Sequence, residues 1–390
     1  MPVEKRKETY RVGMIGCGGK GTGHARTYQT HPATEVVAGC DPDPEQLERF
    51  CRAFKVPGYT NYEEMLRKER IDIAAPILPV SANPDVVVGC TRFPSVKGIQ
   101  SEKPLAASLA DADRMVQACR DRGIKFAAGD MDRNIHNYWD AKKLIDEGAI
   151  GEVKSIHILY GSGLEISGGG CQFLSLARLF ASDADVDWVI GWMAKDPWSD
   201  YDQGAAGYIR FANGIECFMT RTANPKNGVE VLGTQGALHS DIYRIQMWRL
   251  PAERRGESVA AVGMANREKI TAGFLDVNIW PRAGEHDEEG WAIYPRNYNT
   301  VQSLVDALDK NIEPRSSGDN GRKVLEIGIG LRESHRSGMT PVHLPLSDRS
   351  LRMMPYWDRM YARKEQMGRE RYYKGINYQW KGFEQPAVGS

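Results

Sequence analysis

The sequence predicts an α/β protein in two parts, with a doubly wound parallel sheet in residues 1–130 and an α+β arrangement in residues 131–346. In the first part, short apolar segments alternate with segments of helical periodicity, which is typical of strand–helix–strand units around a parallel sheet. In the second part, short strands follow one another across Asn-Gly and Gln-Gly turns, which favours an open, mostly antiparallel sheet. Residues 347–390 are rich in Tyr and Trp, and we expect them to form an arm packed on the body or on a neighbouring subunit.

A glycine-rich turn follows the first apolar segment, Tyr10–Ile15. Gly16, Gly18 and Gly21 form the pattern G-x-G-x-x-G, and a helix is expected to open near Thr22. The first glycine permits a tight turn, the second lets a pyrophosphate approach the backbone, and the third lets the helix pack closely on the strand. Free amides at the start of the helix can hold the diphosphate. The residues expected to contact the cofactor in this turn are Gly16, Gly18, Gly19, Lys20 and Gly21.

An acidic residue, Asp41, ends the second expected strand, which covers residues 35–40. A carboxylate at this point of a dinucleotide-binding unit suits the ribose 2′-hydroxyl of NAD and repels the 2′-phosphate of NADP. A glycine-rich turn alone would be a weak signal, but strand, glycines, helix, strand and acid occur here in the required order. The sequence therefore predicts a Rossmann domain that binds NAD.

The remaining elements of the first part continue the alternation. The clearest is a helix over 109–122, whose apolar residues recur at helical spacing before Gly123. Ligands of such a sheet bind beyond the carboxyl ends of its strands, and both Lys103 and Asp130 fall at strand ends. The other expected helices cover 44–54, 63–69 and 86–91, and the other expected strands cover 71–78, 95–100 and 124–128.

The character of the sequence changes after the Gly-Ala-Ile-Gly segment at 148–151. Short runs that alternate apolar and polar residues indicate strands with one covered face. The expected strands cover 153–160, 207–211, 215–220, 229–233 and 237–240, and the expected helices cover 173–180, 297–311 and 321–335.

The composition excludes several classes of function. The chain carries 51 basic and 51 acidic residues, which argues against nucleic acid or a membrane surface as its partner. No apolar segment is long enough to span a membrane, and the charged N-terminus lacks the apolar core of a secretory signal, so a cytoplasmic protein is expected. The 7 Cys residues are scattered without metal-ligand spacing, which predicts reduced cysteines and no metal site.

Several longer motifs resemble one family. They include S-E-K-P-L-A at 101–106, D-R-N-I-H-N-Y-W at 132–139, F-A-N-G-I-E at 211–216 and L-G-T-Q-G-A-L at 232–238. In content, order and spacing, they resemble the glucose–fructose oxidoreductase / inositol dehydrogenase (Gfo/Idh/MocA) family. The resemblance implies a second domain whose open sheet often forms a dimer interface, so a homodimer or homotetramer is expected. It also implies hydride exchange between a nicotinamide and a carbon of a sugar, sugar acid or cyclitol, so the expected partner is a small carbohydrate.

The resemblance gives the central role to Lys103, which matches the family lysine that touches the reacting hydroxyl beside the cofactor. Physically, a lysine at this place can help to take up the hydroxyl proton. Glu102, Pro79 and Asn83 are also expected near the cofactor, and Asn83 stands at a position that is often His in the family.

One departure from the family pattern concerns the proton chemistry. The family usually carries an Asp and a His in the helix after a Gly-rich loop, and the His exchanges a proton with the substrate. Here Gly168 and Gln172 align with these two residues. Gln can donate and accept hydrogen bonds but cannot carry a proton at ordinary pH. Gln172 is expected to contact the reacting substrate, but the acid/base pair of the family is missing.

Other residues are candidates for the missing role. Tyr160 ends a strand that lines the pocket in relatives, and His136 lies in the D-R-N-I-H motif, although either residue can equally be structural. Asp130 and Arg133 are candidates for holding substrate hydroxyls or an anionic group, because Arg suits planar anions. The expected substrate contacts are Lys103, Asp130, Arg133, His136, Tyr160 and Gln172, of which Lys103, Tyr160 and Gln172 are expected nearest the chemistry.

Three functions are compatible with these residues. The main interpretation is an NAD-dependent sugar oxidoreductase in which Lys103 acts together with another residue. The second is an NAD-dependent glycoside hydrolase, which oxidises the sugar transiently at C3, eliminates the aglycone, adds water and reduces the ketone again. The third is a non-catalytic relative that senses NAD or another ligand, but the intact Lys103 and the intact glycine motif count against it.

Overall fold

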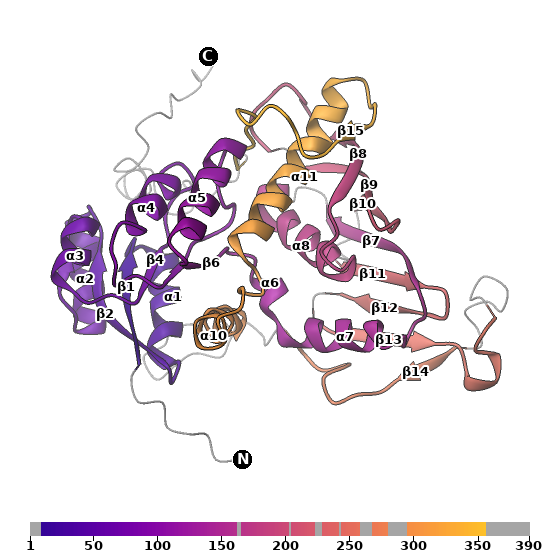
Figure 1. Ribbon diagram of the computed structural model, residues 1–390, viewed down its shortest axis with the longest axis horizontal. Coiled ribbons are helices and arrows are strands. Elements are labelled where there is room, and N and C mark those ends of the chain that lie inside the picture. Colours follow the sequence, from indigo (N-terminus) through magenta and orange to yellow (C-terminus); the bar gives the residue numbers. More distant parts are fainter. Residues whose placement is uncertain are drawn as a thin grey trace.

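The computed structural model describes residues 9–161, 165–202, 204–222, 228–241, 243–257, 267–279 and 295–355. These residues form a 6-stranded sheet and a 9-stranded sheet, with helices between the two (Figure 1). The two sheets confirm the expected fold class, a Rossmann-type parallel sheet joined to an open, mostly antiparallel one.

Strands and helices alternate along the first part of the chain. The strands are β1 (Tyr10–Ile15), β2 (Thr34–Cys40), β3 (Gly58–Tyr59), β4 (Ile73–Pro76), β5 (Gly98–Gln100) and β6 (Lys125–Ala127). The helices are α1 (Gly19–Thr30), α2 (Pro44–Phe54), α3 (Tyr62–Lys68), α4 (Asn83–Cys90) and α5 (Leu109–Asp121), joined from far along the chain by α10 (Pro295–Lys310). The sheet runs β3-β2-β1-β4-β5-β6 and its described pairings are parallel. Helices α1, α2 and α10 share a buried cluster with one face, and α3, α4 and α5 share another with the opposite face.

Differences from the expected elements of this part lie at their ends. Helix α1 begins at Gly19 rather than near Thr22, because Gly18, in an extended conformation, already serves as its N-cap. Helix α2 spans the expected residues, since Asp43 caps its first amides and Pro44 stands at its first position. Strands β4 and β5 are shorter than expected: β4 lacks two expected residues at each end, and β5 begins three residues later than expected.

The second sheet has a parallel pair at its centre and antiparallel pairs around it. Its strands are β7 (Val153–Gly161), β8 (Val186–Met193), β9 (Ala205–Phe211), β10 (Glu216–Thr222), β11 (Gly228–Gly233), β12 (Gly236–Ser240), β13 (Ile245–Arg249), β14 (Glu268–Ile270) and β15 (Val342–His343). They are ordered β14-β13-β12-β11-β7-β10-β9-β8-β15, and β7 pairs in parallel with β10. The sequence did not predict β8, β13, β14 or β15. Strand β8 buries its residues without strict alternation, so its period-two signal is weak.

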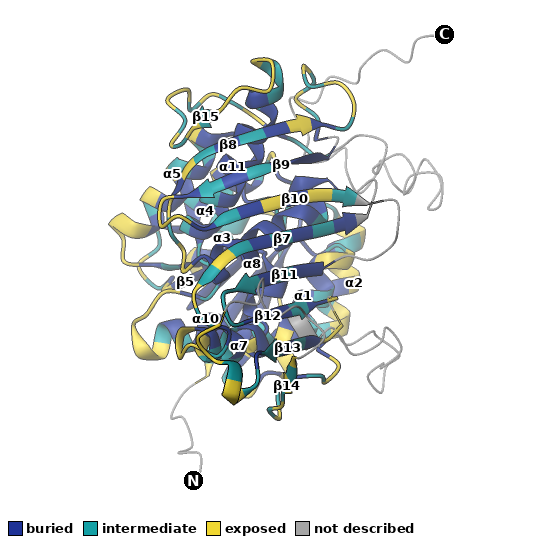
Figure 2. Ribbon diagram, turned by 90° about the vertical axis from the view of Figure 1, so that its right-hand side faces the viewer, coloured by how far each residue is buried: buried dark blue, intermediate teal, exposed yellow. Residues whose placement is uncertain are grey.

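One face of the second sheet carries the helices that meet the first part of the chain. They are the π-helix η1 (Ile166–Gly170), α6 (Met131–Asn134), α7 (His136–Asp146), α8 (Cys171–Phe180) and α11 (Gly318–Arg336). Every residue of α8 is buried, because this helix lies in the interior between the second sheet and α6 and α11. The opposite face of the sheet is open in Figure 2, where no described helix covers it.

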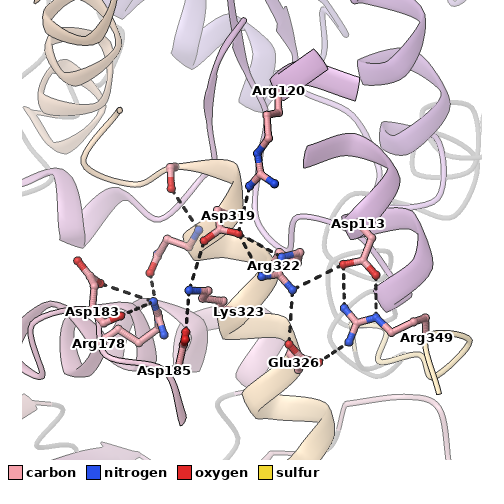
Figure 3. Close-up of polar contacts among 12 residues, drawn as sticks. Asp113, Arg120, Arg178, Asp183, Asp185, Asp319, Arg322, Lys323, Glu326 and Arg349 are labelled. Atoms are coloured by element: carbon pink, nitrogen blue, oxygen red, sulfur yellow. Dashed lines mark hydrogen bonds and ion pairs between the residues drawn. The ribbon is translucent and has the colours of Figure 1, made fainter. Parts of the chain in front are cut away.

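Ion pairs along α11 hold the two parts of the chain together (Figure 3). Asp113 on α5 accepts two hydrogen bonds from the Arg349 guanidinium, at 2.7 and 2.8 Å. The same guanidinium also bonds the buried Glu326 on α11. Arg322 on α11 completes the cluster, with its Nη1 lying 3.6 Å from Asp113 Oδ1. Since α5 belongs to the first part and α11 to the second, this network fixes the relative position of the two walls of the site.

A segment after β15 crosses from one part of the chain to the other. The amide of Leu109 donates to the carbonyl of Leu351 (3.1 Å), and the amide of Met353 donates to the carbonyl of Ala107 (2.8 Å). The carbonyl of Met354 then accepts from the amide of Asp202 (2.6 Å). The described residues of the expected C-terminal arm therefore pack on the body, and 356–390 lie outside the described ranges. No helix of the described part is both long and apolar enough to cross a membrane.

Candidate active site

The glycine turn after β1 has the shape that a dinucleotide diphosphate requires. Gly16 has φ +97°, and a Cβ there would lie 2.5 Å from the carbonyl oxygen of Ile77. A Cβ on Gly21 would lie 1.8 Å from the carbonyl oxygen of Gly16, so only glycine lets α1 pack against the turn. At Gly19, by contrast, a Cβ would meet no described atom within 4 Å, which leaves open space above the start of α1. The turn therefore fits a diphosphate at a helix N-terminus.

Asp41 lies against the same turn, at the end of β2. Its Oδ2 accepts a hydrogen bond from the amide of Cys17 (2.7 Å), and its Oδ1 accepts one from the amide of Asp43 (2.9 Å). Burial raises the pKa of the Asp41 carboxyl, and these two amides oppose the rise. Asp41 thus ties the glycine turn to the edge where a ribose would lie, and its role toward that ribose stays a prediction.

A series of hydrogen-bonded polar side chains lies beneath the glycine turn, and the sequence analysis did not predict it. Gln100 accepts a hydrogen bond from the Tyr28 hydroxyl, and its amide nitrogen lies 2.9 Å from His24 Nδ1. The proton of His24 is thereby directed to Nε2, which lies 2.6 Å from Glu102 Oε1. The only sequence signal for this hydrogen-bonded series was a His one turn into the helix that follows the glycines.

Glu102 connects this hydrogen-bonded series to Lys103. Its Oε2 accepts a hydrogen bond from the backbone amide of Lys103 (3.2 Å). Burial acts to raise the pKa of Glu102, but the hydrogen bond from His24 and the charges of Lys20 and Lys103 lower it overall. Glu102 is therefore an anion held under the segment that carries Lys103.

Lys103 and Asp130 line one pocket at the carboxyl ends of β5 and β6, where sequence analysis expected ligands. The Lys103–Pro104 peptide is cis. A Cβ on Gly129 would lie 2.3 Å from the Lys103 amide nitrogen, so a glycine is needed where the two strand ends approach each other. The pocket is lined by Lys103, Pro104, Leu105, Ala128, Gly129, Asp130, Ile166, Ser167, Cys171, Gly321, Val324, Leu325 and Met353.

The Asp130 carboxyl is buried, and its Oδ2 accepts a hydrogen bond from the Asn320 amide (3.1 Å). Burial raises the pKa of Asp130, and the charge of Arg133 and the polar side chains nearby offset this rise only in part. The site thus presents an amine and a buried carboxyl within one concave wall, a pairing suited to binding and deprotonating a hydroxyl.

Two residues predicted to hold substrate are engaged elsewhere. Arg133 donates to the carbonyl oxygens of Arg315 (2.6 Å) and Ser175 (2.8 Å) and to the Asp183 carboxylate (2.6 Å). All three guanidinium nitrogens are used in these bonds, so Arg133 braces α6 against α8 and does not face the pocket. His136 is exposed at the start of α7 and is not among the residues lining the pocket. The expectation that either residue contacts substrate is not supported by these positions.

Tyr160 and Gln172, expected nearest the chemistry, are buried and are not among the described residues that line the pocket. The Tyr160 side chain is fully buried, and its hydroxyl has no well-aligned hydrogen-bond partner among the described residues. Burial, reinforced by the charge of Asp202, raises the pKa of Tyr160, so the phenol is neutral. Gln172 Oε1 accepts a hydrogen bond from the amide of Asp132 (3.0 Å), which ties α8 to the start of α6. A structural role is sufficient to explain both residues.

Pro79 and Asn83 lie on the loop after β4 and at the start of α4. The carbonyl of Pro79 accepts from the amide of Asn83 (3.2 Å). Asn83 Nδ2 donates to the carbonyl of Leu105 (3.1 Å), a residue of the pocket wall. Its Oδ1 is buried without a partner in the described part of the chain, so an acceptor remains there for a ligand.

The sequence did not predict Ser167, Cys171 or Met353 as pocket residues, because no local motif marks them. Ser167 and Cys171 come from η1 and the start of α8, and Met353 comes from the crossing segment. Burial raises the pKa of the Cys171 thiol well above its usual value, so Cys171 lines the pocket as a neutral thiol. Their nearest sequence signal was the I-S-G-G-G-C stretch around the position of the missing acid/base pair.

The first part of the chain matches a known family. Residues 10–129 fit the family described as "Oxidoreductase family, NAD-binding Rossmann fold" (GFO_IDH_MocA). This segment contains the glycine turn, Asp41 and Lys103, and it ends next to Asp130. Residues 10–129 therefore match the NAD-binding domain of the Gfo/Idh/MocA oxidoreductases.

Individual relatives are similar to part of this chain. The 2,7-anhydro-N-acetylneuraminate hydratase of Escherichia coli (strain K12) is 29% identical over 145 residues, which cover 37% of this chain and 38% of that protein. Inositol 2-dehydrogenase of Salmonella paratyphi B (strain ATCC BAA-1250 / SPB7) is 28% identical over 155 residues, 38% of this chain and 45% of that protein. The matched segment thus spans less than half of either relative. A structure of levoglucosan dehydrogenase with NADH and levoglucosan shares the fold, with a TM-score of 0.67 at 19% identity over 87% of this chain and 100% of that chain.

Proposed function

We propose that this protein is an NAD-dependent oxidoreductase that transfers hydride between the nicotinamide and a secondary carbinol of a neutral carbohydrate. The observation that carries the proposal is the meeting of Lys103 and Asp130 in one pocket at the edge of an NAD-binding sheet. Ligands of doubly wound sheets bind at this edge, so a substrate in the pocket lies beside a bound dinucleotide.

The chain's own residues have separate tasks in this proposal. NAD, held by the glycine turn and Asp41, supplies the hydride acceptor when bound. Lys103 contacts the reacting oxygen, where a charged amine stabilises the developing negative charge and a neutral amine accepts the hydroxyl proton. Asp130 accepts a hydrogen bond from a neighbouring hydroxyl, because its buried carboxyl faces the same pocket.

A neutral substrate is favoured by the charges of the pocket. Among its described lining residues, Lys103 is the one cation and Asp130 the one acid. Arg133, which sequence analysis offered as a site for an anionic group, is bonded to Asp183 and to two backbone carbonyls instead. The rest of the wall is mostly apolar, and Leu105, Val324 and Met353 suit the C–H face of a sugar ring.

Nicotinamide reduction with matched sugars tests this function. Purified protein is given NAD with neutral sugars and cyclitols, each paired with a sugar acid of the same ring, such as glucose with glucuronate. We expect NADH absorbance to rise with a neutral member and to rise less with its acid. Faster turnover of the acid would contradict the neutral substrate. NAD binding with no nicotinamide change on any sugar would favour the non-catalytic, ligand-sensing alternative.

A second candidate function is redox-assisted cleavage or hydration of a glycoside, and the hydratase relative favours it. Both reactions begin with the same hydride step, so the same pocket serves either. They differ in net chemistry, because the second returns the hydride within each turnover. Release of nitrophenol from nitrophenyl glycosides without accumulation of NADH would select the second function.

The open face of the second sheet supports a homodimer or a homotetramer built from dimers. It carries a row of aromatic rings, with Trp188 5.1 Å from Tyr208, and Tyr208 5.1 Å from Phe218, between ring centroids. Trp192 and Phe218 leave 46% and 38% of their surface exposed. Exposed aromatic rows on an uncovered sheet are typical of subunit interfaces. We propose that a second copy of this chain covers this face.

A further inference from the structure

A buried carboxylate lies directly behind the pocket wall formed by η1. Asp202 has no exposed surface, and its Oδ2 accepts hydrogen bonds from the Ser167 amide (2.5 Å) and the Ser167 hydroxyl (2.7 Å). Its Oδ1 accepts from the amide of Gly204 (2.9 Å). Ser167 itself lines the pocket that contains Lys103. The Ser167 hydroxyl therefore links a residue of the pocket wall to this buried acid by a direct hydrogen bond.

We propose that Ser167 contacts the reacting hydroxyl of the substrate and that Asp202 accepts its proton through Ser167. The pair would replace the Asp–His pair that is missing at Gly168 and Gln172. Ser167 touches the substrate, and Asp202 acts through it. This inference rests on the proposed oxidoreductase function. With Asp202 as the proton acceptor, Lys103 serves as the charged amine that stabilises the developing negative charge on the reacting oxygen.

The geometry permits a balanced step. In sugar oxidation, the C–H electron pair leaves with the hydride to NAD, and the carbinol oxygen becomes a carbonyl. The hydroxyl proton passes to Ser167 Oγ while the serine's own proton moves to Asp202 Oδ2, along the existing hydrogen bond. Asp202 becomes neutral, and Ser167 is unchanged. Reduction of a ketone runs the same steps backwards.

The surroundings of Asp202 suit a proton acceptor. Burial raises its pKa to about 6, although the amides of Ser167 and Gly204 and the Ser167 hydroxyl oppose the rise. The nearby titratable groups are Glu165 beside η1, Tyr160 on β7 and Cys171 on α8. The charge of Glu165 adds to the rise, whereas burial raises the pKa of the phenol and of the thiol, which stay neutral. An acid with this pKa is ionised at neutral pH and binds a proton more readily than a surface Asp.

The experiment compares Ser167→Ala with Ser167→Thr and Asp202→Asn in the full-length protein. The probe is the neutral sugar that wild-type protein oxidises fastest in the paired panel described above. Ser167→Ala keeps the hydrogen bond from the backbone N–H to Asp202 but removes the hydroxyl that relays the proton. We therefore expect kcat to fall at least about tenfold. In wild-type protein kcat should rise with pH through about 6, as Asp202 ionises. This limb should vanish in Ser167→Ala and Asp202→Asn and persist in Ser167→Thr, which keeps a hydroxyl.

Controls separate a relay from a merely structural bond. Ser350 donates to Asp348 in the same hydroxyl-to-carboxylate manner (2.6 Å) on the surface, so Ser350→Ala should leave kcat and its pH profile unchanged. NADH affinity and Tm should match wild-type in Ser167→Ala. If Ser167→Ala keeps kcat within about twofold and kcat still rises with pH through about 6, the proposed relay is wrong. The proposed oxidoreductase function would still stand. If wild-type protein oxidises no sugar, the proposed function fails and the relay fails with it.

Discussion

The glycine turn at 16–21 and the pocket around Lys103 belong to one fold, but the chain supplies their residues in different ways. The turn is continuous in sequence, and its acid, Asp41, follows one strand later. The pocket collects Lys103, Asp130, Ser167 and Met353 from separate elements, with Asp202 behind them. A nucleotide site can thus be recognised from local spacing, whereas the proposed substrate site exists only once the two sheets are brought together.

The largest effect is expected at Lys103, where the two halves meet. Lys103→Met removes the amine from the pocket while keeping an unbranched side chain of similar length. We expect kcat to fall at least about 100-fold, because the reacting oxygen loses its charged partner. NADH affinity, measured by fluorescence titration, should stay close to wild-type. Persisting turnover would show that the family role does not transfer to this residue.

A substitution on the open sheet tests whether the second half of the chain forms the proposed subunit interface in addition to part of the pocket. Phe218→Glu places a charge in the middle of the aromatic row, so we expect the dimer to dissociate when measured by mass photometry. Ile312, 50% exposed near the end of α10, provides the control, and Ile312→Glu should leave the assembly intact. A monomeric wild-type protein at micromolar concentration would remove the proposed interface.

The preference for NAD over NADP tests the Rossmann half, which could be predicted best from the sequence. Asp41→Ala removes the carboxylate that would repel the 2′-phosphate, so the ratio of NAD to NADP affinity should fall by roughly tenfold. Asp41→Asn is the matched variant, since it removes the charge but keeps an acceptor for the amide of Cys17 or Asp43. An unchanged ratio in both variants would mean that Asp41 serves the turn and does not meet the ribose.

The last prediction concerns stability and the ion-pair network that joins the two halves. Arg349→Met leaves Glu326 buried without this partner and breaks the link to Asp113, so we expect a loss of about 2 kcal/mol in the free energy of unfolding. Thermal unfolding should show Tm lowered by roughly 3–5 °C. Arg52 forms an exposed ion pair with Glu48, and Arg52→Met should leave Tm unchanged. Equal behaviour of the two variants would mean that the α11 network does not hold the halves together.

Most of the first sheet could be predicted, because apolar runs, glycines and caps are local signals. The same reasoning placed Lys103 and Asp130 at strand ends, since parallel strands share one edge. It missed β8, which lacks regular alternation, and it missed His24, whose partner Glu102 lies far along the chain.

The second half of the chain shows where a prediction from the chemistry of single residue types fails. Arg133 was offered as an anion site because its chemistry suits one, but tertiary contacts with Asp183 and two carbonyls use its guanidinium. Tyr160 was offered because a strand end faces the pocket in relatives, but here Tyr160 is buried and is not among the residues that line the pocket. No spacing in the sequence connects Ser167 with Asp202, so only the folded chain shows them as a pair.

The most direct test of the central claim follows the nicotinamide itself. Purified wild-type and Lys103→Met proteins are loaded with NAD, and their NAD and NADH are quantified after denaturation, before and after neutral sugars are added. The account predicts that both proteins hold the cofactor and that only wild-type protein changes its redox state. A wild-type protein that takes up no NAD, or whose NAD is unaffected by every sugar and glycoside, would contradict it.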